Sequence, residues 1–314
     1  MSPVAQQAWT WFKRLAPWAL AALVLALVAR QARTVEWPAV WLALQALSIV
    51  QLLTAAGLAL LSYGLVASFD LIGRRLTGHT LSAPRTLATA AISYAFNLNF
   101  GALVGGFGLR LRLYMRGGLS APTVAQVIAH SMVTNWLGYL WVGGVVLLWA
   151  PPRLTGDWAQ SDMALRAIGA AMIALALVYL ALCGWSRQRE LSWHGHTLAL
   201  PGGRVALLQA LLGGASWLLI GAIAWSLFGT RIDYPAVLGA LLLAAVAGVL
   251  THVPAGLGVL EAVFVATLGN RLPATEVLAT VLAYRAAYYL MPLALALPAY
   301  AWSEAAARRG RRAE

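Results

Sequence analysis

The stretch Thr251-His252-Val253-Pro254-Ala255-Gly256-Leu257-Gly258-Val259-Leu260-Glu261 decides how this sequence is interpreted. It places a proline and glycine cluster, followed by a carboxylate, inside an apolar region that covers residues 235–268. In hydrocarbon every backbone N–H and C=O needs a hydrogen-bond partner, so a broken helix is tolerated only where protein or a wet cavity surrounds it. A glutamate at membrane depth indicates function by default. The stretch therefore predicts a transport site inside a membrane.

Composition fixes the class of protein. Hydrophobic residues make up 61% of the chain and charged residues only 10%, and the mean hydropathy is +0.76. Because a spanning helix needs about 20 apolar residues, this chain is expected to be an all-α polytopic membrane protein. The stretches that can span, or nearly span, a membrane are residues 15–28, 40–69, 124–149, 164–183, 205–228 and 277–302. We expect residues 1–314 to form a single transmembrane domain.

The distribution of lysine and arginine predicts the topology, since cytoplasmic loops carry an excess of both. The excess falls on one side if residues 88–118 enter and leave the membrane from the cytoplasm, and residues 235–269 from the opposite side. The basic clusters within 13–14, 74–85, 110–116 and 308–312 are then cytoplasmic, whereas 153–162 lies on the opposite side. We expect about six spanning helices plus two opposed re-entrant helical hairpins, with both termini cytoplasmic.

The two broken segments resemble each other. Gly105-Gly106-Phe107-Gly108-Leu109 and Ala255-Gly256-Leu257-Gly258-Val259 share one pattern at an offset of 150 residues, at which Asn135 also aligns with Arg285. Inverted repeats with paired glycine or proline interruptions point to a substrate site between the repeats. Close helix packing, which also selects small residues, is the alternative. The pattern suggests inverted repeats at about 40–150 and 205–302.

Polar residues near the breaks are candidates for a translocation path. Asn97 and Asn99 precede the first glycine cluster, where their amides either replace lost backbone hydrogen bonds or contact substrate. His130 and Asn135 on the next helix either bond between helices or contact substrate. His252 could titrate near neutral pH, although a lone histidine beside a break more often caps or packs. The candidate path also contains Gly105, Gly106, Gly108, Pro254, Gly256 and Gly258.

Glu261 and Arg285 each lie inside an apolar stretch, where an unpaired charge would be costly. We expect them to be the only opposite-signed ionisable pair that the topology leaves in the membrane interior. Two roles remain open for the pair. One is a salt bridge that fixes the second hairpin to the last helix, and the other is a gate in a transport cycle.

Arg110, Arg112 and Arg116, with Tyr114 between them, form a basic cluster where the first hairpin returns to the cytoplasmic face. Arginine binds phosphate through a planar fork of donors, so the cluster predicts a site for an anionic lipid headgroup. The alternative is an ordinary anchor of the positive-inside kind.

No motif indicates an enzyme. The sequence has no nucleotide-binding loop, nucleophile elbow or zinc motif, and its single cysteine, Cys183, allows no intrachain disulfide. Residues 190–201 alternate around a glycine and predict a small cytoplasmic β-hairpin, whose two histidines are too few to claim a metal site. We expect no catalytic residue, metal or cofactor. The net charge of +12 is better explained by membrane topology than by a nucleic-acid partner.

Several segments closely resemble the YbhN-like family of inner-membrane proteins. They are residues 93–98 (SYAFNL), 104–114 (VGGFGLRLRLY), 134–139 (TNWLGY) and 252–264 (HVPAGLGVLEAVF), with Ala283-Tyr284-Arg285 followed by Tyr288, Tyr289 and Pro292. That family is similar in turn to the membrane domain of MprF, the lysyl-phosphatidylglycerol synthase and flippase. The resemblance covers nearly the whole chain, implies lipid translocation between leaflets, and places Tyr288 with the path.

Two departures from the MprF pattern matter. Ala255 stands where that pattern usually has a second glycine, which suggests the YbhN-like branch. The sequence also contains no aminoacyl-transferase domain, so lysyl-phosphatidylglycerol is not assumed to be the substrate.

The resulting hypothesis is a phospholipid translocator of the bacterial inner membrane, which handles an anionic lipid without a covalent intermediate. Arg110 and Arg112 would hold the lipid phosphate, the hairpin tips would line the path, and Glu261 with Arg285 would gate it. The alternatives are a transporter of a small soluble solute and a non-transporting scaffold for a lipid-synthesis enzyme.

The topology can be tested with single cysteines on a Cys183→Ala background. Cysteines within 74–85 and 110–116 should be labelled from the cytoplasmic side and those within 153–162 from the opposite side, because only that arrangement gives the charge asymmetry. Labelling of the 74–85 and 110–116 clusters from opposite sides would show that the first hairpin crosses the membrane.

Overall fold

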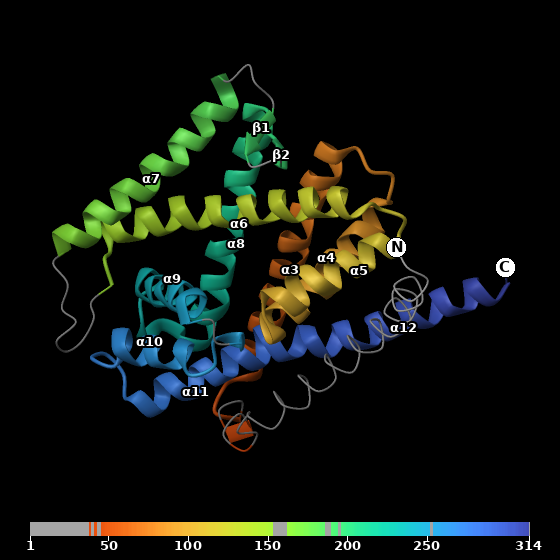
Figure 1. Ribbon diagram of the computed structural model, residues 1–314. Coiled ribbons are helices and arrows are strands. Elements are labelled where there is room, and N and C mark those ends of the chain that lie inside the picture. Colours follow the sequence, from red (N-terminus) through yellow and green to blue (C-terminus); the bar gives the residue numbers. More distant parts are fainter. Residues whose placement is uncertain are drawn as a thin grey trace, which may run out of the picture.

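The computed structural model describes residues 38, 41–42, 45–152, 162–185, 190–193, 196–251 and 254–313. These residues form a helical body with one small β-hairpin (Figure 1). Its elements are α3 (Ile49–Thr77), α4 (Ala83–Phe100), the π-helix η1 (Ala102–Leu109), α5 (Arg110–Arg116), α6 (Ala121–Trp149), α7 (Asp162–Trp185), β1 (Glu190–Trp193), β2 (His196–Ala199), α8 (Gly203–Phe228), the 3-10 helix η2 (Gly229–Arg231), α9 (Tyr234–Thr251), the 3-10 helix η3 (Pro254–Gly256), α10 (Val259–Leu268), α11 (Ala274–Arg285), the π-helix η4 (Ala286–Leu290) and α12 (Met291–Ala313).

Six described helical segments are long and apolar enough to cross a membrane. They are Ile49–Thr77, Ala121–Trp149, Asp162–Trp185, Gly203–Arg231, Tyr234–Thr251 and Ala274–Ala305. Five overlap predicted spans, whereas the predicted span at 15–28 lies outside the described residues. The remaining segment, Tyr234–Thr251, is α9, the first arm of the second predicted hairpin. Its 18 residues measure roughly 27 Å, slightly less than the hydrocarbon core of about 30 Å. The all-α polytopic membrane class is confirmed.

The first hairpin consists of α4, η1 and α5, and it turns at Gly101. The backbone there has φ 86° and ψ 167°, a conformation that glycine adopts without steric cost. The two arms meet again at the far end, where the Tyr114 hydroxyl donates to the carbonyl of Thr86 at 3.3 Å. The segment therefore returns to the end from which it started, and its re-entrant placement in a membrane stays a prediction.

The glycines at 105–108 do not make this turn, which corrects the position predicted for the first break. They lie inside η1, and a Cβ added to Gly105 would stand 2.1 Å from the backbone nitrogen of Asn97. A Cβ on Gly106 would stand 2.6 Å from the Asn97 side-chain oxygen. These glycines let the returning arm touch the backbone of α4, since any side chain would separate the two.

The second hairpin consists of α9, η3 and α10, and it breaks where the sequence predicts. Ala255 and Gly256 both have φ 57°, and Gly258 has φ 76°. Ala255 is the one non-glycine residue with a positive φ among the described residues. Such a conformation is uncommon for a residue with a Cβ and persists only where the surroundings enforce it.

The order of helix, hairpin and helix occurs twice, first as α3, the first hairpin and α6, then as α8, the second hairpin and α11 with α12. The two leading helices, α3 and α8, are antiparallel neighbours, because Gln51 at the start of α3 lies beside Gly229 at the end of α8. This arrangement agrees with opposed halves, and the inverted repeat itself stays a prediction.

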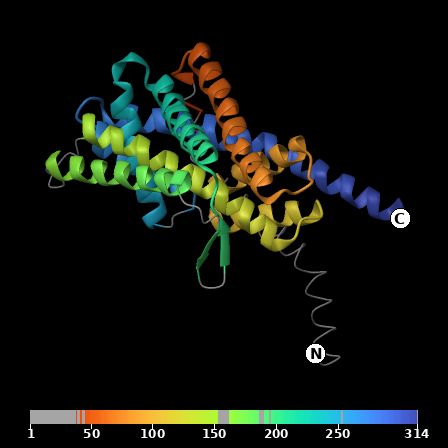
Figure 2. The same ribbon diagram turned by 90° about the horizontal axis from the view of Figure 1, so that it is seen from above.

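The predicted β-hairpin is present. Strands β1 and β2 pair antiparallel, with Glu190 opposite Ala199 and Trp193 opposite His196. Figure 2 shows the hairpin projecting away from the helices. Its cytoplasmic placement stays a prediction.

Helix α6 lies across α8 and beside α7, and glycine pairs set both contacts (Figure 1). At the crossing with α8, a Cβ on Gly213 would stand 2.1 Å from the carbonyl of Thr134, and one on Gly138 would stand 2.1 Å from the backbone of Gly213. At the contact with α7, Gly144 and Gly169 approach each other in the same way. Small residues at helix interfaces let backbones approach closely in lipid, where no hydrophobic effect holds helices together.

The α6–α8 crossing should not tolerate a methyl group. We expect Gly138→Ala or Gly213→Ala to cost about 1–3 kcal/mol, because the backbones must separate. Thermal unfolding of the purified protein in detergent measures this loss. The matched control is Gly57→Ala in α3, where nothing lies within 4 Å of an added Cβ, and an unchanged transition in the α6 and α8 variants would contradict the crossing.

Candidate functional site

The tips of the two hairpins meet beside the end of α11. Helix α4 contacts both η3 and η4, so the first hairpin touches the break of the second hairpin and the π-helix that follows α11. We call this meeting point the junction and define it by Asn99, Ala255, Gly256, Glu261, Arg285, Tyr288 and Tyr289. It brings together residues that are far apart in the sequence.

Arg285 binds both the carboxylate and the broken backbone of the second hairpin. Its Nε donates to Glu261 Oε1 at 2.5 Å, and its Nη2 donates to Glu261 Oε2 at 3.0 Å. Its Nη1 and Nη2 also donate to the carbonyls of Ala255 and Gly256 at 2.9 and 2.8 Å. The guanidinium carbon lies 5.3 Å from the ring centre of Tyr289. Arg285 therefore satisfies carbonyls that the interrupted helix cannot pair.

The π-helix η4 exposes two backbone carbonyls that side chains from α3 and α4 use. The Tyr63 hydroxyl donates to the carbonyl of Tyr288 at 3.2 Å, and Asn99 Nδ2 donates to the carbonyl of Tyr289 at 3.1 Å. π-Helical turns are rare and occur frequently at functional sites. These bonds tie the first hairpin and α3 to the same turn that carries Arg285.

A buried set of hydroxyl groups surrounds Tyr288. Its hydroxyl lies 2.9 Å from that of Tyr94 and 3.4 Å from Ser62 Oγ. Tyr63 packs edge-on against both Tyr94 and Tyr288. The junction thus holds a polar interior next to the arginine, bounded by aromatic rings.

The structure contains a second buried ion pair that the sequence did not predict, and the expectation that Glu261 and Arg285 are the only pair in the membrane interior stays a prediction. Asp70, in α3, has a fully buried side chain and forms an ion pair with Arg110. Arg110 Nε donates to Asp70 Oδ2 at 3.0 Å, and the Tyr114 hydroxyl donates to the same oxygen at 2.6 Å. Arg110 and Tyr114 therefore hold α5 against α3. The sequence signal was a carboxylate about two turns before the end of a long apolar helix.

His79 lies in the loop after α3, with its ring 6.2 Å from that of Tyr114. Burial and then the positive charge of Arg74 lower the pKa of His79 from 6.5. The lowered pKa favours the neutral form of the ring beside Tyr114.

Arg112 and Arg116 converge on one carboxylate, that of Glu304 in α12. Arg112 Nη2 donates to Glu304 Oε2 at 3.1 Å, and its Nη1 donates to the hydroxyl of Tyr300 at 3.1 Å. Arg116 forms an ion pair with the same carboxylate and donates to the carbonyl of Ser303 at 3.0 Å. The side chains of Arg112, Arg116 and Glu304 are 17–23% exposed. Two arginines thus bind an anionic group at a partly open position.

Comparison with known proteins places the chain in a family. Residues 15–296 match the family described as the lysylphosphatidylglycerol synthase TM region. The chain belongs to this family. It is 38% identical to the inner membrane protein YbhN of Escherichia coli K12, over 96% of this chain and 95% of that protein. It is also 30% identical to the uncharacterized protein slr0712 of a Synechocystis strain, over 91% of each.

Most of the residues predicted for the path of this family member lie at or near the junction. Asn99, Gly256, Glu261, Arg285 and Tyr288 are joined by the contacts above. The first hairpin holds Asn97, Gly105, Gly106 and Gly108 where its two arms pack together, and Pro254 and Gly258 flank the second break. His252 lies outside the described residues.

His130 and Asn135 belong to a different contact, between α6 and α8. The His130 carbonyl accepts from Thr134 Oγ1 at 2.8 Å and from Gln209 Nε2 at 3.4 Å. The Asn135 carbonyl accepts from Trp217 Nε1 at 3.0 Å. Both residues therefore take part in helix packing, and a contact with substrate stays a prediction.

Loss of Arg285 should harm folding more than loss of Glu261. Glu261→Gln leaves a buried arginine without its carboxylate, which typically costs about 3–5 kcal/mol. Arg285→Gln leaves the Glu261 charge and also the carbonyls of Ala255 and Gly256 without donors, and each unsatisfied group adds about 1–3 kcal/mol. Folded yield and thermal unfolding in detergent measure both losses.

The double variant should lose less than the sum of the two single variants, because the charges interact. The control pair is Arg231 and Glu276, whose side chains are each 47% exposed, and whose loss should cost at most about 1 kcal/mol. Strict additivity at positions 261 and 285 would show that the two side chains do not interact.

Proposed function

We propose that this protein moves a phospholipid with an anionic headgroup between the leaflets of a bacterial inner membrane, without forming a covalent intermediate. Its family and the name of its Escherichia coli relative support a role with membrane lipid in that membrane. The transport activity and the anionic headgroup are inferences from the geometry of the basic cluster and the junction.

The observation that carries the proposal is the convergence of Arg112 and Arg116 on Glu304. A phosphate diester and a carboxylate are both anions that accept from the planar donors of arginine. In our proposal the lipid phosphate replaces the Glu304 carboxylate between the two arginines. Because these side chains are partly exposed at the end of the first hairpin, a headgroup can reach them without unfolding the hairpin.

Arg110 has a different role in this proposal from the one expected from the sequence alone. It forms an ion pair with the buried carboxylate of Asp70, which also accepts a hydrogen bond from Tyr114. Arg110 therefore positions the hairpin and is not free to exchange partners. Arg112 and Arg116 then bind the headgroup. The junction, in which Arg285 holds the second hairpin closed on α11, would act as the gate.

Substitutions on either side of the exchange should have opposite effects. Arg112→Gln with Arg116→Gln should abolish the preferential copurification of anionic lipid and slow its movement in vesicles. Glu304→Gln removes the competing carboxylate and should raise copurification several-fold. Native mass spectrometry of bound lipids and a labelled-lipid assay in proteoliposomes measure these effects.

Truncation after Ala307 is the matched control for basic charge. It removes the arginines at 308, 309, 311 and 312, which should interact with the membrane surface at only about 1 kcal/mol each. Both readouts should stay nearly unchanged. If truncation destroys lipid selectivity while the Arg112 and Arg116 variant keeps it, the phosphate site is elsewhere.

The same assay separates the proposal from its two alternatives. Purified protein that binds lipid but moves none in vesicles would favour a scaffold for a lipid-synthesis enzyme. Uptake of a soluble solute with no lipid movement would favour a solute transporter.

A further inference from the structure

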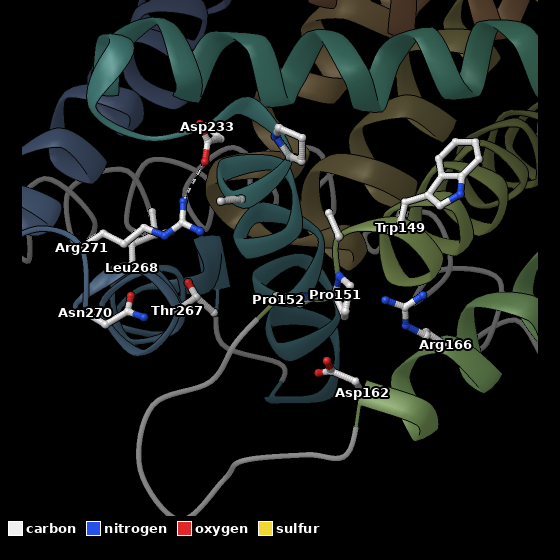
Figure 3. A pocket seen from close by; sticks show the side chains of 13 residues that line it. Trp149, Pro151, Pro152, Asp162, Arg166, Asp233, Thr267, Leu268, Asn270 and Arg271 are labelled. Carbon is white, nitrogen blue, oxygen red and sulfur yellow. Dashed lines mark hydrogen bonds and ion pairs between the residues drawn. The ribbon is translucent and has the colours of Figure 1, made fainter.

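A pocket of about 490 Å³ opens at the end of the molecule opposite to the Arg112 and Arg116 cluster. The end of α6, the start of α7, the start of α9 and the end of α10 line it (Figure 3). The start of α6 follows α5 and its arginines, and the 29 residues of α6 put roughly 43 Å between the two ends. The pocket is therefore separate from the proposed phosphate site.

The ends of the lining helices predict that the pocket lies at the level of the membrane surface. The apolar helices α6, α7 and α9 all end or begin at its walls, where spans of their length are expected to leave the hydrocarbon. Trp149, on its rim, is 82% exposed, and tryptophan is enriched at membrane–water interfaces. Leu268 and Ala236 contribute apolar surface to the same lining. Its volume lies within the range of about 300–1,000 Å³ that is typical of small-molecule sites.

The charges of the lining are balanced but only partly paired. Arg271 donates to Asp233 at 3.1 Å on one side of the pocket. Asp162 and Arg166 project from the first turns of α7 on the other side, as Figure 3 shows. Neither forms an ion pair with any residue in the described part of the chain, although a spacing of four residues on a helix would permit one. The pocket thus presents one cation and one anion to a ligand.

We infer that this pocket binds the headgroup of a zwitterionic aminophospholipid. Arg166 would donate to the phosphate, and Asp162 would accept from the primary ammonium, so that each charge of the headgroup meets an opposite charge. An anionic headgroup without an amine would satisfy Arg166 but would face the carboxylates of Asp162 and Asp233. The pocket therefore prefers phosphoethanolamine over phosphoglycerol. This inference does not depend on lipid movement, because it concerns binding alone.

The test is lipid retention by the full chain in detergent, measured by native mass spectrometry after incubation with equimolar phosphatidylethanolamine and phosphatidylglycerol. We expect one retained phosphatidylethanolamine that Arg166→Gln weakens by about tenfold, the effect of losing one charge-assisted hydrogen bond. Asp162→Asn should weaken phosphatidylethanolamine and strengthen phosphatidylglycerol. Both side chains are exposed, so the variants should fold normally.

The matched control is Arg231→Gln, which removes an exposed arginine at the same end of the molecule but outside the pocket. It should leave retention unchanged. The Arg112→Gln with Arg116→Gln variant should also keep the phosphatidylethanolamine, which separates this site from the proposed function. In the Arg112→Gln with Arg116→Gln variant, equal retention of both lipids, or no effect of an added Arg166→Gln, would overturn the inference. Saturable binding of free phosphoethanolamine without retention of the lipid would overturn it in favour of a soluble zwitterion.

Discussion

The structure depends on the pairing of backbone carbonyls where a helix is broken inside an apolar region. A break in hydrocarbon removes the partners of several carbonyls, and each unpaired group costs several kcal/mol. Arg285 supplies donors to Ala255 and Gly256 and keeps its own charge balanced by Glu261. Because one guanidinium does both, the positive φ of Ala255 can persist. The second hairpin, and with it the junction, rests on this single side chain.

A buried ion pair holds each hairpin against a neighbouring helix, but the hairpin carries the arginine in one case and the carboxylate in the other. In the first, the arginine is on the hairpin and the carboxylate of Asp70 is on the neighbouring helix. In the second, the carboxylate of Glu261 is on the hairpin and the arginine is on the neighbouring helix. Removing one partner of a buried pair leaves an uncompensated charge, so each pair links the position of its hairpin to that of a long helix. The junction lies where these two linked units meet.

The sequence predicts the parts of this fold that follow from composition and local chemistry. Long apolar runs predict the spans, proline next to glycine predicts the second break, and an isolated Glu and Arg in apolar surroundings predict each other. The turn at Gly101 is not predicted, because glycine serves both sharp turns and close packing, and the denser cluster at 105–108 serves packing. Asp70 and Glu304 are missed as partners for a different reason. They lie 40 and 188 or more residues from their arginines, and only the packing of α3, α5 and α12 brings them there.

The π-helix η4 determines which face of α12 meets the first hairpin. A π-helical turn contains one residue more than an α-helical turn, so everything after it is rotated by about 100° and shifted by about 1.5 Å relative to an uninterrupted helix. Glu304 and Tyr300 contact Arg112 with that offset in place. A return of this turn to α-helical geometry would swing Glu304 about a quarter of the way around the helix. The winding of one turn beside Arg285 is thus coupled through α12 to the position of the carboxylate that the arginines hold at the distant end of the hairpin.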